Sequence, residues 1–238
     1  MKIDSRHIKS LLLILFIFCC TTISYSQTAK SQERSKEGRF IFIDKKFDAS
    51  FLKSIGHFQY VSRDGDDLAD MLRAIRVQAV NAGANCFKLR DFQINDTTKQ
   101  MVLTLDTYLA SDRQLELNSE MHETNVVYII SDDKFSDKDY SFKLNGVAMN
   151  IKSGYYHKHY LKQGTETIIN KGGFTGTSYR LKWEENKPPI FLTVSGVAFA
   201  EPTGIPNRGP GVAITTGKIH QLSKNLGLLL VNTLVEMK

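Results

Sequence analysis

The sequence contains very little cysteine. Only Cys19, Cys20 and Cys86 occur among its 238 residues, and the first two lie in an apolar stretch near the start of the chain. If that stretch is removed during export, one thiol remains, and one thiol cannot close a disulfide within the chain even in an oxidising compartment. The sequence therefore predicts a fold that is stabilised by its hydrophobic core rather than by covalent cross-links.

Residues 1–26 have the pattern of a secretory signal peptide. Basic residues precede the apolar run 11–20, and the small residues Ser24 and Ser26 stand three and one positions before the expected cleavage point at Gln27. The apolar run is about ten residues long, whereas a membrane-spanning helix needs roughly 20. We therefore expect export to the periplasm or the extracellular side, with no transmembrane helix after signal removal.

Lipid attachment at Cys19 or Cys20 is the alternative fate of this segment. The residues Phe16, Ile17 and Phe18 lack the small side chain expected before a lipidated cysteine. Ordinary cleavage after Ser26 is therefore the preferred expectation.

No strong charge excess is present. The chain has 31 Lys and Arg against 25 Asp and Glu, and removal of residues 1–26 takes away three basic residues and one acidic residue, which leaves 28 − 24 = +4. The densest basic patch, residues 30–39, also contains Glu33 and Glu37, so residues 27–38 are predicted to form a flexible arm. An exported protein with this charge pattern is not expected to bind nucleic acid.

Proline and glycine are scarce in the first half of the chain. Four of the 16 glycines and none of the five prolines precede residue 140. This shift predicts an α+β fold in two parts, an N-terminal ββαββ domain over residues 39–110 and a β-sandwich-like domain with a C-terminal helix over residues 125–238. The polar residues 111–124 between them are predicted to be a linker that can form a short helix.

The ββαββ order follows from composition and periodicity. Strand-like segments rich in β-branched and aromatic residues cover residues 39–44, 55–61, 86–94 and 101–109. Between the second and third, apolar residues recur at helical spacing, with Asp64 or Asp66 as the expected cap and Gly83 as the expected end. The residues of this apolar face are Leu68, Met71, Leu72, Ile75 and Ala79.

The junction between this helix and the next strand resembles that of a known group of domains. Ala82-Gly83-Ala84-Asn85, with Ala79 one turn earlier, resembles the junction in small envelope α/β domains. These are the heavy-metal-binding-like domain family and the domain of the outer-membrane stress-sensor lipoprotein that feeds the Rcs phosphorelay. The resemblance covers residues 66–94 and implies the fold, with Gly83 at positive φ. It implies no metal chemistry, because no cluster of cysteines or histidines accompanies the motif.

Short strands are predicted throughout the second half of the chain. They recur about every ten residues with turn signals between them, which is typical of a sandwich or open barrel. Residues 125–173 also resemble small envelope β-domains of unknown function, on the segments VYII, KLNG and GYYHKHYLKQGTETIINKGG. The predicted strands are residues 126–131, 140–144, 147–151, 155–161, 166–169, 178–183 and 190–200.

A C-terminal amphipathic helix is predicted from Lys218 onward, with Thr215 or Thr216 as its cap. Apolar residues keep a helical period to Leu234, although Gly227 costs such a helix about 1 kcal/mol. Residues 228–231 could instead form a strand. We expect the apolar face to cover the β-rich domain, and docking on a partner groove or a membrane surface is the alternative.

His157 and His159 are the candidate metal ligands. On a strand, residues two apart project from the same face, so both imidazoles can approach one divalent metal ion. A catalytic zinc site needs a third protein ligand, and a structural site needs a fourth. His57, His122, His220, carboxylates and Cys86 are the other candidates, but none stands at a recognisable ligand spacing. An ordinary half-exposed strand face is therefore the preferred interpretation.

Other segments carry weaker chemical patterns. Residues 211–218 resemble a phosphate-binding loop, but five residues rather than four separate the glycines, and Ile219 replaces the required Ser or Thr. Residues 132–139 are acidic but lack the order of ligands in an EF-hand loop. Cys86 is expected to be packed in the core, and the chain has no Gly-x-Ser-x-Gly nucleophile motif.

The glycine-rich residues 171–179 form the candidate recognition loop. Phe174 and Tyr179 are the candidate ligand-binding residues, because aromatic rings on a polar loop can stack on a sugar or a peptide. The same residues can equally be a plain connection between two strands.

These patterns predict an exported, non-catalytic binding or interaction protein of the cell envelope, with an envelope protein or a glycan as its partner and with no cofactor. Two alternatives stay open. One is a metal-binding protein that holds a divalent ion with His157 and His159. The other is a hydrolase whose site is assembled from dispersed residues.

Overall fold

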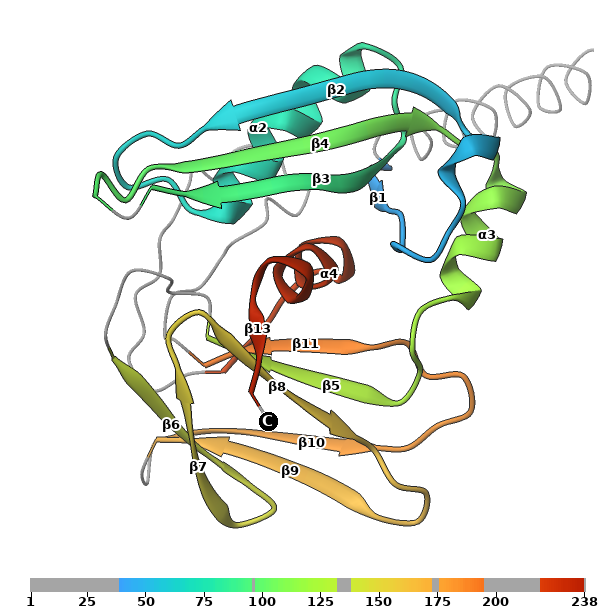
Figure 1. The fold of residues 1–238 in the computed structure, drawn as a ribbon. Helices are drawn as coiled ribbons and strands as arrows, with labels where there is room; N and C mark the ends of the chain where they lie inside the picture. The colour runs from blue at the N-terminus through green and yellow to red at the C-terminus, as the bar shows by residue number, and fades with distance from the viewer. Residues whose placement is uncertain (1–38, 96, 132–137, 173–175, 195–218, 238) are drawn as a thin grey trace, which may run out of the picture. The chain divides into compact units, whose positions relative to one another are not determined.

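Figure 1 shows the computed structural model of the chain, which describes residues 39–95, 97–131, 138–172, 176–194 and 219–237. Phe40–Lys238 groups as one unit apart from the residues that precede it. The fold class is α+β with a ββαββ N-terminal half and a sandwich-like second half, as the sequence predicts. The signal peptide, the arm over residues 27–38 and the phosphate-loop-like residues 211–218 lie outside the described residues.

The N-terminal half forms a four-stranded sheet in the order β1-β3-β4-β2, in which β1 is parallel to β3 and the other neighbours are antiparallel. One helix, α2, packs on this sheet through the apolar face that the sequence predicts. The elements are β1 (Ile41–Phe42), the 3₁₀ helix η1 (Ala49–Phe51), β2 (Lys53–Val61), α2 (Leu68–Asn81), β3 (Cys86–Ile94) and β4 (Met101–Leu109).

Helix α2 begins slightly later than expected. Its cap is Asp67 rather than Asp64 or Asp66, because Asp70 stands at the third helical position after Asp67 and completes a reciprocal pair. The Asp67 carboxylate accepts from the Asp70 N–H at 2.8 Å, and the Asp70 carboxylate accepts from the Asp67 N–H at 3.4 Å. Gly83, with φ of 94°, ends the helix as predicted.

The polar segment after β4 contains the short helix α3 (Asp112–Glu120). Ser111 caps it, and the Gln114 side chain accepts from the Ser111 N–H at 2.8 Å. Asn118 is its one buried residue, and it faces the N-terminal sheet, where it binds the backbone of Phe42.

Two sheets pack face to face in the second half. One has the order β12-β11-β5-β8-β13 and the other β10-β9-β6-β7, and one apolar cluster draws its side chains from both. The strands are β5 (Val126–Ile130), β6 (Asp139–Leu144), β7 (Val147–Lys152), β8 (Tyr155–Tyr160), β9 (Glu166–Lys171), β10 (Thr177–Lys182), β11 (Ile190–Thr193), β12 (His220–Gln221) and β13 (Val235–Glu236).

The C-terminal helix α4 (Lys224–Thr233) starts later than the sequence predicts. Its cap is Ser223 rather than Thr215 or Thr216, which lie outside the described residues. Residues 219–222 extend the sheet instead, because β12 pairs with β11 and the Leu222 N–H donates to the Phe191 carbonyl at 2.9 Å. Residues 228–231 are helical, so the strand alternative for them is wrong.

Helix α4 is buried between the N-terminal sheet and the five-stranded sheet (Figure 1). It contacts β1 and β3 on one side and β5 and β11 on the other, and its leucines belong to an apolar cluster that also includes Phe42, Phe87 and Phe191. A helix that is apolar all round is expected in such a position. The chain itself therefore covers the leucines of α4. The alternative prediction, that these residues dock on a partner or a membrane, is wrong.

Strand β5 is buried on both faces. Val126, Tyr128 and Ile130 join the cluster around α4, while Val127 and Ile129 join the cluster between the two sandwich sheets. Such a strand has a continuous apolar sequence rather than an alternating one. Since the cluster around α4 draws on both halves of the chain, the division into domains at residues 39–110 and 125–238 stays a prediction.

We expect Gly227→Ala to destabilise the protein, although alanine favours a helix by about 1 kcal/mol over glycine. A Cβ at Gly227 would overlap the Phe191 ring, which is buried and stacked on Tyr128 with ring centroids 5.1 Å apart. Overpacking of this kind costs about 1–3 kcal/mol or more. Chemical denaturation measures the change, with the exposed helical substitution Gln78→Ala as the control. A Gly227→Ala protein as stable as the natural one would contradict this close contact.

Candidate functional site

The two candidate metal ligands lie on β8 and face the interior of the sandwich. His157 is opposite Ile129 and His159 is opposite Val127, the two β5 residues on the inner face. The His157 ring lies 6.5 Å from the Phe142 ring, centroid to centroid, and His159 Nε2 lies 3.3 Å from Thr167 Oγ1. Both imidazoles therefore point the same way, as predicted, but toward a phenyl ring and a hydroxyl.

Burial lowers the pKa of both histidines, because the interior disfavours the charged imidazolium. Glu236 opposes this effect at His157, whereas His157 itself and Lys162 add to it at His159. Neutral imidazoles are the form that binds metal. Among the described residues, however, no third His, Cys, Asp or Glu joins the pair, so the metal site stays a prediction.

The candidate recognition loop is described only in part. Phe174 lies outside the described residues, and Tyr179 is on β10, where it packs against the sandwich core. The acidic residues 132–137 also lie outside them. The ligand-binding role of Phe174 and Tyr179 therefore stays a prediction.

A polar cluster that the sequence did not indicate surrounds Glu123, between α3 and β5. Its carboxylate accepts from Lys158 Nζ at 2.7 Å, from the Tyr128 hydroxyl at 3.3 Å and from the Tyr160 hydroxyl at 3.2 Å. The Lys158 ammonium also lies over the Tyr160 ring, 5.0 Å from its centroid. The residues come from the face of β8 opposite to the two histidines and from the neighbouring strand β5.

The groups of this Glu123 cluster satisfy one another. Burial disfavours the ionised carboxylate, but the hydrogen bonds from Lys158 and the tyrosines outweigh it and lower the pKa of Glu123. Burial likewise opposes charge on Lys158, and the hydrogen bond to Glu123 raises its pKa above the ordinary value. A cluster whose donors and acceptors are already paired is better suited to hold β5 and β8 together than to bind a ligand.

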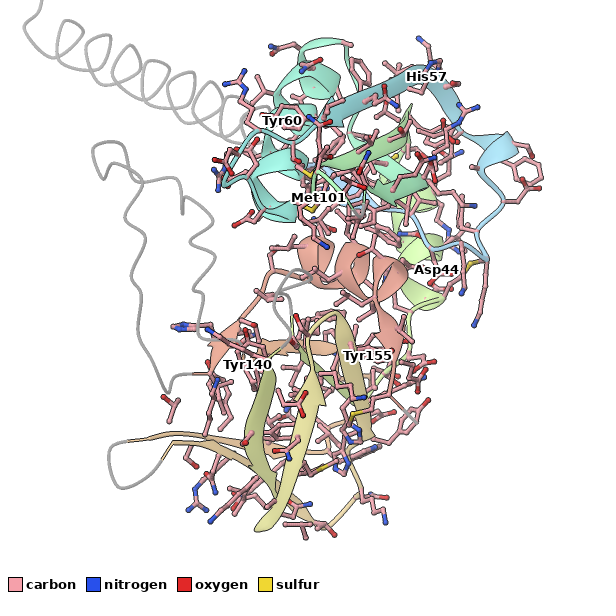
Figure 2. All side chains as sticks on the ribbon, turned by 60° about the vertical axis from the view of Figure 1, so that its left-hand side comes forward. Asp44, His57, Tyr60, Met101, Tyr140 and Tyr155 are labelled. Carbon is pink, nitrogen blue, oxygen red and sulfur yellow. The ribbon has the colours of Figure 1, made fainter. Side chains whose placement is uncertain are left out.

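An open depression lies at one end of the N-terminal sheet, between the β2–α2 connection and the β3–β4 connection. Its volume is about 620 Å³. Ser62 joins the two connections, since its Oγ accepts from the Met101 N–H and its N–H donates to the Met101 carbonyl, both at 2.8 Å. Tyr60 and Met101 mark this end of the sheet in Figure 2. The lining residues are Ser62, Arg63, Asp64, Gly65, Asp66, Thr98, Lys99, Gln100 and Met101.

The charged side chains at the depression differ in whether they have a partner. The Asp66 carboxylate accepts from the Tyr60 hydroxyl at 3.0 Å and from the Arg63 N–H at 2.8 Å. The hydrogen bond between Tyr60 and Asp66 raises the pKa of Tyr60. Within the described ranges, the exposed side chains of Arg63 and Lys99 have no ion pair. Among the described residues, the depression therefore offers three charged side chains without an ion pair, the cations Arg63 and Lys99 and the carboxylate of Asp64.

The lining residues do not form a recognisable catalytic set. They include no histidine and no cysteine, and one of the two carboxylates, that of Asp66, is already hydrogen-bonded to Tyr60. Polar and charged groups on loops held by a rigid sheet are instead typical of a binding site. No pattern in the sequence indicates this site, because residues 62–66 and 98–101 are far apart in the chain and meet through the pairing of β2 with β4.

Removal of the Glu123 carboxylate is expected to destabilise the protein by about 1–3 kcal/mol, because it leaves a largely buried charge without its partner. The Lys158 side chain is only 18% exposed. Glu116→Ala is the matched control for Glu123→Ala, since its pair with Arg113 has side chains 64% and 69% exposed and such a pair contributes about 0–1 kcal/mol. Equal losses in the two variants, measured by chemical denaturation, would contradict the role of the cluster.

Comparisons with known proteins identify no relative from which a function could be transferred. No protein-family model matches the chain, and searches of curated proteins and of solved structures find no similar protein. Among the described residues, no helix combines the length and the apolar character needed to cross a membrane. The two family resemblances stated from sequence therefore stay predictions.

Proposed function

We propose that this chain is an exported, non-catalytic binding protein of the cell envelope, and that it binds its partner at the depression between residues 62–66 and 98–101. The observation that supports this proposal is the pair of uncommitted cations, Arg63 and Lys99, on two connections that a hydrogen-bonded sheet holds in place. Export rests on the signal-peptide pattern of residues 1–26.

The chemistry of the depression favours a polar partner that carries negative charge. Among the described residues, its lining is dominated by charged and hydroxyl- or amide-bearing side chains and contains no aromatic ring on which a neutral sugar could stack. Carboxylates or phosphates would find complementary charge on Arg63 and Lys99. The partner is therefore an acidic surface of an envelope protein or an acidic glycan.

The binding test uses residues 27–238 labelled for NMR and two soluble probes, a hexaglutamate peptide and the neutral sugar chitotriose. We expect hexaglutamate to shift the amide signals of residues 62–66 and 98–101, and we expect the effect to weaken as salt is added. Chemical-shift titration measures both location and affinity. Signals that stay unchanged with both probes, or that shift only elsewhere, would contradict the proposed site.

Charge-removal variants sharpen this test. Arg63→Ser with Lys99→Ser is expected to weaken hexaglutamate binding about two- to thirtyfold, because two exposed ion pairs contribute about 0.2–1 kcal/mol each. The matched control is Lys53→Ser with Lys143→Ser, which removes two exposed cations that have no ion pair among the described residues and do not line the depression. Equal weakening in both double variants would show attraction to net charge alone.

Metal binding by His157 and His159 has its own test, because both neutral imidazoles face one way. The purified protein is loaded with zinc, dialysed and analysed for metal, beside the His157→Ala and His159→Ala variants. We expect less than one zinc per chain, since a phenyl ring and a hydroxyl face the pair. If the natural protein retains one zinc per chain and both variants lose it, metal binding would replace the proposed function.

A further inference from the structure

The imidazole of His122, just after α3, is buried and has no hydrogen-bond partner among the described residues. The residue is only 6% exposed, and neither Nδ1 nor Nε2 has a partner among the described residues. Buried polar groups in folded proteins are almost always hydrogen-bonded, because an unpaired one loses its interaction with water and gains nothing in return. The unpaired imidazole therefore lowers the stability of the fold rather than adding to it.

Burial and the nearby Lys224 disfavour protonation of the His122 imidazole. Burial has the largest effect and lowers the pKa of His122 to about 4, Lys224 of α4 acts in the same direction, and Asp44 after β1 opposes them. Burial also lowers the pKa of Lys224. Lys224 is the first residue of α4, whose positive dipole end adds to the repulsion of a second cation.

The surroundings of His122 also hold strand β1 in place. Asn118 of α3 stands four residues before His122, and its amide donates to the Phe42 carbonyl at 2.9 Å and accepts from the Asp44 N–H at 2.8 Å. Asn225, next to Lys224, accepts from the Phe42 N–H at 3.0 Å. Figure 2 shows Asp44 beside α3 and α4, at the level of this contact. We call the contacts that Asn118 of α3 and Asn225 of α4 make with residues 42–44 the β1 joint.

We infer that His122 is an acid-sensitive latch, and that its protonation opens the β1 joint while the sandwich stays folded. A cation at His122 repels Lys224 and the start of α4, and it needs water that the closed joint excludes. Water can reach the ring only if the contacts of α3 and α4 with residues 42–44 loosen. That movement breaks the hydrogen bonds of Asn118 and Asn225 to residues 42–44.

The direction of the pH effect follows from proton binding in the two states. The closed joint holds His122 neutral, whereas an opened, hydrated imidazole titrates near its ordinary pKa of about 6.5. The open state therefore binds more protons, and opening becomes more favourable as pH falls through that value. Between pH 7.5 and pH 5.5 the equilibrium constant for opening is expected to rise about tenfold.

Residue-resolved amide hydrogen exchange on residues 27–238 at these two pH values tests the latch, after correction for intrinsic exchange rates. The reporters are the Phe42 and Asp44 amide protons, which are bonded to Asn225 and Asn118. We expect about tenfold faster corrected exchange at pH 5.5 for both reporters. The Met149 and Ile151 amides of β7 and the Ile169 amide of β9, in the sandwich, are expected to change much less.

His122→Gln is expected to abolish the pH effect at Phe42 and Asp44, because glutamine stays neutral. His57→Gln, on the exposed strand β2, is the matched control and is expected to retain it (Figure 2). An effect that persists in His122→Gln, or an equal acceleration in β7 and β9, would overturn the latch. If His122→Gln does not fold, NMR titration of the imidazole in the natural protein decides, since a value at or above 6.5 in the folded state excludes the mechanism.

Discussion

The side chains of two asparagines close the outer edge of β1, and the arrangement of both halves of the fold depends on them. β1 is only two residues long and pairs on one side with β3. On its other side, Asn225 accepts from the Phe42 N–H, and Asn118 donates to the Phe42 carbonyl and accepts from the Asp44 N–H. Without these amides, buried backbone groups would be left unpaired. The same bonds fix α3 and α4 to the N-terminal sheet.

Asparagine side chains also bind backbone groups at the ends of other strands. The Asn85 amide donates to the Ala110 carbonyl at 2.7 Å and accepts from the Ala110 N–H at 2.8 Å, which secures the end of β4. The Asn125 amide forms the corresponding pair with Glu184, at 2.8 and 3.1 Å, from a backbone with φ of 54°. An asparagine amide can replace a strand because it carries both a donor and an acceptor, and an ionised aspartate only accepts. Without any disulfide among the described residues, these amides tie together segments far apart in the chain.

Sequence periodicity predicts what local spacing determines. The α2 face, the ββαββ order and the common orientation of His157 and His159 all follow from repeats of 3.6 or two residues. The predicted start of α4 is wrong because Ile219 and Leu222 fit a helical repeat, whereas residues 220–222 are hydrogen-bonded to β11. Apolar spacing alone cannot distinguish a buried helix from a short buried strand. The depression at Arg63 and Lys99 and the neighbours of the histidine pair depend on long-range pairing, which no short segment encodes.

The proposed binding site and the β1 joint lie at opposite ends of one strand. Residues 62–66 and 98–101 meet where β4 begins, whereas α3 follows the end of β4 through Ala110 and Ser111. Nine residues of β-strand span about 30 Å. β4 is also paired along its length on both sides, with β2 and with β3, so it has one hydrogen-bonded arrangement rather than two. Coupling between distant sites requires an element with two arrangements that both sites bias. Acid opening of the joint would therefore change how the two halves of the chain are held while leaving the depression in place.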